Sequence, residues 1–367
     1  MVVPVTVIIP VYRANKMKFW ECLNSLLAQT VSPEKVIIVD DGNTKQEKAK
    51  LQEVIKKVTS TRKIELVLLQ NDTNEGVSTA RNKAISEAST KWITFLDCDD
   101  KLSPQFLERL YEATYLYENI DIVACGCIAD DGMECHPNHF FMKEEVFSGE
   151  NLIEVEKALI NQFYRRIGYI DTAFGVPWGK LYSLKTVNGI WFDPLLKRME
   201  DSIWNHQILI ERKPKILYID EMLYIYNTEH IAKYSQEYAE DLSDWTKVIN
   251  SRKRLVSSHL GTGDQIEEFF FEEVVRILVL MLEKKYFHKE NKNKKQTFLE
   301  LKQLLENKTV NTSLKYVCKR TPFYRQIMLK LLAAGNLKLA YAMYIARNLK
   351  KKNGSAGMND PAHFLYL

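Results

Sequence analysis

The chain has 367 residues, of which 46% are hydrophobic and 27% charged, and its formal net charge is +4 at pH 7. This length exceeds one ordinary domain, and the composition is typical of a soluble globular protein that buries a full core without disulfides. The sequence contains no apolar run of about 18 residues, so it predicts no membrane-spanning helix. The N-terminus has no basic leader, so we expect no signal peptide and a cytoplasmic location.

The first 130 residues alternate between short apolar runs and segments with helical spacing. The apolar runs, which predict buried strands, are Thr6–Val11, Lys35–Asp40, Ile64–Gln70, Trp92–Asp97 and Ile120–Ile128. The segments that predict helices are Met17–Gln29, Thr44–Val58, Ser78–Ala88 and Ser103–Glu118, the last with Ser103 as its N-cap. This alternation predicts a mostly parallel sheet covered by helices on both faces, with ligands at the carboxyl ends of the strands.

The rest of the chain is irregular up to about residue 235 and then has helical patterns. Ile266–Leu282 predicts a buried helix, and the charged stretch Lys284–Lys295 predicts a solvated loop. Between Glu306 and Asp360 the chain carries basic residues and no acidic one. This basic region predicts either two helices over 323–352 packed with their lysines outward, or a face over 308–352 that binds an anionic membrane. No nucleic-acid-binding motif accompanies it, so we expect no nucleic acid partner.

Three polar clusters follow predicted strands: Asp40–Asn43, Asn71–Asn82 and Asp97–Asp100. Each cluster alone is compatible with a turn, because Asp, Asn and Gly favour turns. Parallel strands end at the same edge of a sheet, so the three together indicate a binding site there. Asp97 and Asp99 suit a divalent cation that bridges to a diphosphate, because Mg²⁺ and Mn²⁺ prefer oxygen ligands.

The cysteines offer a second, weaker metal hypothesis. Five potential zinc ligands lie close in sequence: Cys125, Cys127, Cys135, His136 and His139. The Cys-x-Cys spacing is unusual for zinc, and residues 120–128 have the pattern of a strand. We therefore favour ordinary buried or hairpin cysteines in a reducing compartment.

Several motifs in order resemble the family 2 glycosyltransferases. They are Thr6–Tyr12 (TVIIPVY), Ser25–Thr30 (SLLAQT), Ile38–Asn43 (IVDDGN), Asn74–Asn82 (NEGVSTARN), Phe95–Asp100 (FLDCDD), Trp178–Tyr182 (WGKLY) and Glu200-Asp201. The resemblance implies a GT-A fold, a Rossmann-like α/β sheet flanked by helices, with a helical extension. It places the catalytic domain over 1–230, with a nucleotide-sugar-binding half over 1–130 and an acceptor half over 131–230, followed by the basic helical region 231–367.

The resemblance also implies roles for individual residues. Asp41 would contact the base of the nucleotide, which is expected to be uracil, while Arg81 would hold the nucleotide and Asp97 would lie near the ribose. Further donor contacts are expected from Pro10, Tyr12 and His230. Asp99 would coordinate Mn²⁺ or Mg²⁺ on the diphosphate, and Asp201 would be the general base of an inverting transfer.

The function implied is metal-dependent transfer of a sugar from a nucleotide-sugar donor to a glycan or lipid-linked acceptor in cell-surface polysaccharide synthesis, at the inner face of the membrane. Pro10–Asn15 lacks the glycines of a nucleotidyltransferase loop or of a dinucleotide-binding G-x-G-x-x-G. Ile38–Asp41 resembles a phosphoacceptor signalling domain, but that hypothesis leaves Asp97–Asp100 and Glu200-Asp201 without a role. An inactive nucleotide-binding scaffold of the same fold stays open.

Overall fold

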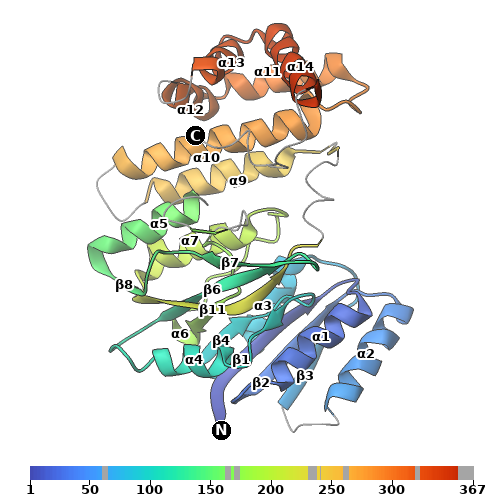
Figure 1. The fold of residues 1–367 in the computed structure, drawn as a ribbon, viewed down its shortest axis with the longest axis vertical. Helices are drawn as coiled ribbons and strands as arrows, with labels where there is room; N and C mark the ends of the chain where they lie inside the picture. The colour runs from blue at the N-terminus through green and yellow to red at the C-terminus, as the bar shows by residue number, and fades with distance from the viewer. Residues whose placement is uncertain are drawn as a thin grey trace. The chain divides into compact units, whose positions relative to one another are not determined.

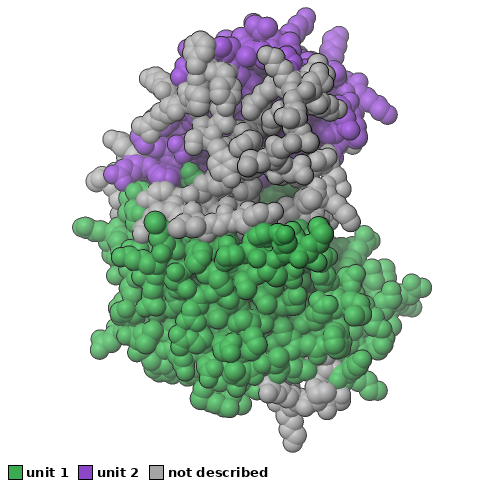
Figure 2. Space-filling model, in the orientation of Figure 1, with its two compact units in different colours: residues 1–232, 250–262 green, residues 233–249, 263–367 purple. Residues whose placement is uncertain are grey.

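A computed structural model describes residues 1–59, 65–161, 167–168, 174–229, 238–239, 241–258, 264–318 and 323–353. The chain divides into two compact units, coloured separately in Figure 2. The first comprises residues 1–232 and 250–262, and the second comprises 233–249 and 263–367.

The N-terminal half of the first unit contains four parallel strands in the order β3-β2-β1-β4 (Figure 1). Their bounds are Glu65–Asn71 for β3, Ser32–Asp41 for β2, Val2–Val11 for β1 and Trp92–Phe95 for β4. The helices between them are α1 (Lys16–Leu27), α2 (Lys45–Thr59) and α3 (Val77–Glu87). Residues such as Ile8 and Ile38 are completely buried, as expected for central strands that are covered on both faces.

The second half of this unit extends the same sheet. Strand β10 (Lys180–Ser183) runs antiparallel between β4 and β6 (Ile122–Asp130), and β6 pairs in parallel with β11 (Ile216–Asn227). The smaller strands are β5 (Lys101–Leu102), β7 (Cys135–His139), β8 (Glu145–Phe147) and β9 (Ile167–Gly168). Its helices are α4 (Phe106–Ala113), the short 3₁₀ segment Gly149–Asn151, α5 (Leu152–Ile160), α6 (Leu184–Val187) and α7 (Glu200–Arg212). The predicted α/β class, with helices flanking the sheet, is confirmed.

The second unit is helical, as the sequence predicts. Its helices are α10 (Asp264–Met281), the π-helical segment Leu282–Tyr286, α11 (Lys294–Glu306), α12 (Lys308–Cys318), α13 (Phe323–Ala333) and α14 (Leu337–Asn353). Helix α9 (Ser243–Val256) begins in this unit, and its residues from 250 onward belong to the first. Among the described residues, no helix combines the length and the apolar character needed to cross a membrane.

The structure corrects two local predictions. The loop predicted over Lys284–Lys295 is instead helical up to Tyr286, and Tyr286 and Phe287 are only 5% and 2% exposed. These two aromatic side chains are buried although the surrounding stretch is charged, and α11 already begins at Lys294.

The helix predicted over Ser103–Glu118 begins later and ends earlier, at Phe106 and Ala113. Ser103 is not its N-cap, because Gln105 occupies that position. The backbone N–H of Ser103 donates instead to the carbonyl of Leu223 in β11 at 2.9 Å. The carbonyl of Ser103 accepts from the side chain of Gln29 at 2.6 Å. Tertiary contacts thus hold Ser103 outside the helix.

Candidate active site

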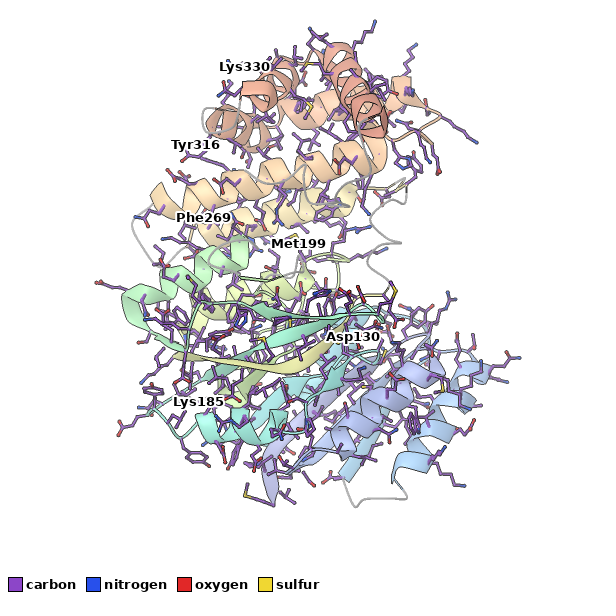
Figure 3. All side chains as sticks on the ribbon, viewed as in Figure 1. Asp130, Lys185, Met199, Phe269, Tyr316 and Lys330 are labelled. Atoms are coloured by element: carbon purple, nitrogen blue, oxygen red, sulfur yellow. The ribbon has the colours of Figure 1, made fainter. Side chains whose placement is uncertain are left out.

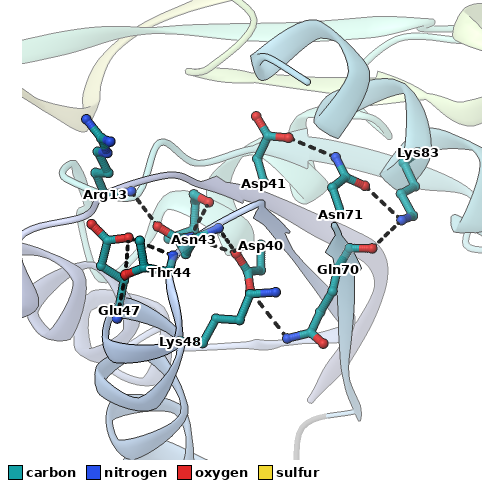
Figure 4. Close-up of polar contacts among 11 residues, drawn as sticks. Arg13, Asp40, Asp41, Asn43, Thr44, Glu47, Lys48, Gln70, Asn71 and Lys83 are labelled. Carbon is teal, nitrogen blue, oxygen red and sulfur yellow. Dashed lines mark hydrogen bonds and ion pairs between the residues drawn. The ribbon is translucent and has the colours of Figure 1, made fainter. Parts of the chain in front are cut away.

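Asp40 holds the turn that follows β2 (Figure 4). This side chain is completely buried, and its Oδ1 accepts from the backbone N–H and the side-chain amide of Asn43, at 3.0 and 2.7 Å. Asn43 in turn donates to the carbonyl of Val11 at 3.0 Å and accepts from the N–H of Arg13 at 2.7 Å. Asp40 and Asn43 therefore join the ends of β1 and β2, and Asp40 is structural.

Asp41 supports the loop that leads into α3. One of its carboxylate oxygens accepts from the side chain of Asn71 at 2.8 Å and from the N–H of Glu75 at 3.0 Å, and the other accepts from the N–H of Gly76 at 2.9 Å. Gly42 must remain glycine here, because its φ is +73° and a Cβ would lie 2.1 Å from the backbone of Thr73. A carboxylate can accept about four hydrogen bonds, so Asp41 retains acceptor capacity for a ligand.

Arg81 connects two groups of carboxylates. Its side chain is buried, with Nη2 at 3.2 Å from Oδ1 of Asp97 and Nη1 at 3.3 Å from Oε1 of Glu200. The guanidinium also lies over the ring of Phe192, 5.3 Å from its centroid. Burial alone would lower the pKa of Arg81, but the charges of Asp97, Glu200 and Asp201 outweigh it and raise this pKa. Arg81 is therefore a permanent cation at the centre of the site.

The acidic turn after β4 contains one structural carboxylate and two that can reach a ligand. Asp100 is only 1% exposed, and it accepts from the hydroxyl of Tyr224 at 2.6 Å and from the N–H of Asn227 at 2.8 Å. Burial and the charges of Asp97 and Asp99 raise the pKa of Asp100 well above its ordinary value. The side chain of Asp97 is 28% exposed, and Asp99 is half-buried.

Glu200 and Asp201 form the first turn of α7, after Met199, which adopts a left-handed conformation with φ of 53° and is labelled in Figure 3. Burial and the charge of Asp201 raise the pKa of Glu200 to about 7, although Arg81 opposes this shift. Burial also raises the pKa of Asp201, again against the charge of Arg81. Carboxylates with raised pKa values are suited to accept a proton near neutral pH.

A buried polar network holds this turn from behind. Arg252 of α9 donates to the hydroxyl of Ser202 at 2.7 Å and to Nδ1 of His206 at 2.8 Å, and Nε2 of His206 lies 2.9 Å from Glu156 of α5. A guanidinium can only donate, so Nδ1 must accept and Nε2 carries the hydrogen that Glu156 accepts. Arg252, His206 and Glu156 are all completely buried. Sequence reasoning missed this network.

The WGKLY motif lies in the interior. Trp178 is 3% exposed and stacks on Tyr224, with ring centroids 4.3 Å apart and an angle of 8° between the planes, so it is an interior residue and not a platform for a sugar. Lys180 is 1% exposed, donates to the carbonyl of Val176 at 2.6 Å and lies 4.4 Å from the ring centroid of Phe174. Burial lowers the pKa of Lys180 to about 7.

The remaining predicted donor contacts differ in position. Pro10 is buried at the end of β1, opposite Val39 of β2. Tyr12 is 39% exposed, and the guanidinium of Arg13 lies 5.1 Å from its ring centroid. His230 lies outside the described residues. The predicted donor contacts Asp41, Arg81 and Asp97 belong to the three clusters that the structure brings to one edge of the sheet.

Where the structure describes the chain, no three His, Cys, Asp or Glu side chains are grouped as metal ligands. For the zinc hypothesis, Cys125 and Cys127 are buried in β6, Cys135 is exposed, and Nδ1 of His139 lies 2.6 Å from Asp220.

For a hard cation, the acidic turn supplies carboxylate oxygens at Asp97 and Asp99. This donor set suits Mg²⁺ or Mn²⁺ when substrate phosphates and water complete the coordination. The residues present therefore fit such an ion.

A mixed α/β sheet with carboxylates at the carboxyl edge of its parallel strands is typical of enzymes that bind nucleotides. A family model described as Glycosyl transferase family 2 matches residues 6–188. The chain belongs to this family and is a glycosyltransferase.

Two relatives are also named as glycosyltransferases, and a solved structure shares the fold. The chain is 26% identical over 224 residues to glycosyltransferase GlyA of Streptococcus pneumoniae. The matched region covers 60% of this chain but only 30% of GlyA. It is 26% identical over 272 residues to the uncharacterized glycosyltransferase EpsJ of Bacillus subtilis, covering 73% of this chain and 74% of EpsJ. The crystal structure of S. aureus TarS 1-349 in complex with UDP-GlcNAc has a TM-score of 0.62 at 19% identity, and the match covers 94% of this chain and 92% of that one. The last likeness is one of fold.

Proposed function

We propose that this glycosyltransferase moves a sugar from a UDP-sugar to a hydroxyl of a glycan or lipid-linked acceptor in cell-surface polysaccharide synthesis, with inversion at the anomeric carbon. The observation that carries the proposal is the position of Arg81, whose guanidinium contacts both Asp97 at the acidic turn and Glu200 beside Asp201. One cation thus joins the expected donor site to the expected base. The fold shared with TarS, whose crystal structure contains UDP-GlcNAc, supports a UDP-sugar as donor.

In this proposal the donor lies along the carboxyl edge of the parallel strands. Asp41 accepts a hydrogen bond from the base, Asp97 contacts the ribose, and Arg81 lies beside the phosphates. Pro10, Tyr12 and His230 complete the donor contacts. Asp99, with Asp97 nearby, would hold Mn²⁺ or Mg²⁺, which when bound offsets the negative charge on the departing diphosphate.

Asp201 is the proposed general base. It accepts the proton of the acceptor hydroxyl as the hydroxyl oxygen forms a bond to the anomeric carbon and the bond from that carbon to the diphosphate breaks. The pKa of Asp201 is raised by burial, which makes it a stronger base than an exposed Asp. Its Oδ1 accepts from the N–H of Ser202 at 2.7 Å, a contact that orients the carboxylate.

A panel of UDP-sugars, including UDP-N-acetylglucosamine, tests this proposal. We expect slow hydrolysis of at least one donor with Mn²⁺, suppression of that hydrolysis by EDTA, and faster release of UDP when an acceptor is added. Binding of UDP without turnover of any donor in the panel, with or without a range of lipid-linked and glycan acceptors, would instead favour the inactive scaffold.

A further inference from the structure

Helix α14 has apolar residues on both of its sides. The side that faces the rest of the second unit contains Leu337 and Ala340, which are 7% and 0% exposed. The opposite side contains Leu339 and Ile345, which are 49% and 37% exposed, together with the exposed Ala342 and Ala346. Lys338 is also exposed on this side, so aliphatic side chains and a cation lie together there. The outer side of α14 therefore presents apolar area beside a positive charge.

Helix α13, which packs against α14, has a similar outer side. Its buried side contains Met328, Leu329 and Leu332, which are 8%, 4% and 0% exposed. Its outer side contains Ile327, which is 37% exposed, and the exposed residues Ala334 and Lys330, the last of which is labelled in Figure 3. Each of the two helices thus exposes at least one large aliphatic side chain close to a lysine.

The charged residues of α13 and α14 themselves have a single sign. Lys330 of α13 and Lys338 of α14 are exposed, and from residue 307 to residue 359 the sequence contains no Asp or Glu. Contact with a second copy through the same surface would bring these cations together without a carboxylate to pair with, because a twofold interface joins a surface to itself. A nucleic acid would neutralise the lysines but would leave the aliphatic side chains without an apolar partner.

An anionic lipid bilayer satisfies both features. Its headgroups attract lysines, and its acyl region accepts aliphatic side chains from helices that lie in the plane of the interface. We propose that the outer sides of α13 and α14, which we call the lipid face and define by Ile327, Lys330, Lys338, Leu339 and Ile345, bind an anionic membrane surface. The proposal deepens the proposed function, because it places the enzyme where a lipid-linked acceptor would lie.

Co-sedimentation of the full chain with vesicles tests the lipid face. We expect binding to vesicles that contain phosphatidylglycerol, weak binding to phosphatidylcholine alone, and loss of binding in about 1 M salt, where the screening length falls to roughly 3 Å. Lys330→Gln together with Lys338→Gln should weaken binding by about 25-fold, on the order of fivefold for each lysine. Leu339→Gln together with Ile345→Gln should weaken it by about tenfold, because less apolar area enters the bilayer.

Helix α11 of the same unit provides the matched controls. Leu299 is 53% exposed and Lys302 is also exposed, so Leu299→Gln together with Lys302→Gln changes the same residue types outside the lipid face. This variant should bind vesicles as the wild type does, and circular dichroism should show unchanged helicity in all variants. Equal loss of binding in the control variant, or equal binding of the wild type to neutral and anionic vesicles, would overturn the proposal.

A second measurement separates the lipid face from an interface between copies. Sedimentation velocity without lipid should give the same oligomeric state for the wild type and for Leu339→Gln/Ile345→Gln. A wild-type dimer that this variant dissociates would overturn the proposal. Vesicle binding needs neither donor nor acceptor, so its failure would leave the transferase proposal standing, and inactivity toward UDP-sugars would leave the lipid face standing.

Discussion

Arg81 of α3 and Glu200 of α7 are in contact, with 3.3 Å between Nη1 and Oε1, although 119 positions separate them in the sequence. The same guanidinium contacts Asp97 through Nη2. Both contacts depend on the forked geometry of arginine, which presents several donors in one plane. The acidic turn after β4 and the first turn of α7 are therefore joined through one side chain.

Arg81→Lys keeps the positive charge but cannot reproduce this fork. We expect UDP to bind about tenfold more weakly and donor turnover to fall by about 100-fold, because charged hydrogen bonds of this kind contribute on the order of 1.5–3 kcal/mol. Calorimetry with UDP and an assay of UDP release would measure the two effects. Arg109 also pairs with carboxylates but lies at the surface, so Arg109→Lys should change neither value. Wild-type turnover in Arg81→Lys would contradict the role of the fork.

Glu200 should make stability depend on pH. Burial and Asp201 raise its pKa from 4.5 to about 7, so the folded state holds this proton more tightly than the unfolded state does. The stabilisation is fully present below pH 4.5 and is lost as the pH rises through about 7. Between these values, stability should fall by at most about 1.4 kcal/mol per pH unit because of this group.

Urea unfolding of the wild type and Glu200→Gln from pH 4.5 to 7.5 measures this contribution as a difference. The variant should lose less stability than the wild type as the pH rises. Glu211 is exposed near the end of the same helix, and Glu211→Gln should keep the wild-type slope. Parallel curves for the wild type and Glu200→Gln would show that Glu200 does not carry the raised pKa.

Arg252 should contribute strongly to the stability of the fold, although it lies far in sequence from the acidic motifs. Arg252→Met would leave Glu156 buried without its compensating cation. This change should lower the free energy of unfolding by about 3–5 kcal/mol. Urea unfolding should detect this loss, and Glu156→Gln should restore part of it in the double variant. Arg254→Met, at an exposed position two residues away, is the control and should be close to neutral. If Arg252→Met lost no more stability than the control variant, the buried network would not have the stabilising role that we assign to it.

Replacement by Asn should have different effects at the two neighbouring residues Asp99 and Asp100. If Asp99 is the metal ligand that we propose, Asp99→Asn should abolish any gain in UDP affinity from Mn²⁺ and leave UDP affinity in EDTA unchanged. Asp100→Asn should instead lower the melting temperature, because Asp100 accepts from Tyr224 and Asn227 in the interior. Titration calorimetry and thermal unfolding distinguish the two outcomes. Full Mn²⁺ enhancement in Asp99→Asn would move the metal ligand elsewhere.

The sheet and the edge that carries the site were predictable because they follow from local patterns. The apolar runs near Val7, Ile38 and Phe95 have the composition of buried parallel strands, and parallel strands end at a common edge. That rule alone places Asp41, Arg81 and Asp97 close together. The failures were at Ser103 and at Tyr286, where contacts with distant segments override local preference.

Other features of the site could not be predicted because they have no local signal. Glu156, His206 and Arg252 are 50 and 46 positions apart, and no periodicity connects them. The aromatic ring of Phe192 beneath Arg81 is likewise visible only once the chain is folded. Trp178 shows the opposite case, because a motif cannot tell whether its aromatic ring faces a ligand or, as here, the ring of Tyr224.

The central claim is that Asp201 is the general base beside a donor site that does not depend on it. The most direct test compares Asp201→Asn with the wild type in two assays, UDP affinity and release of UDP from the donor that the panel identifies. We predict UDP affinity within about threefold of the wild type and turnover lower by about 100-fold or more, as expected for loss of a general base. Turnover close to the wild-type value, with the variant folded and binding UDP, would contradict the assignment.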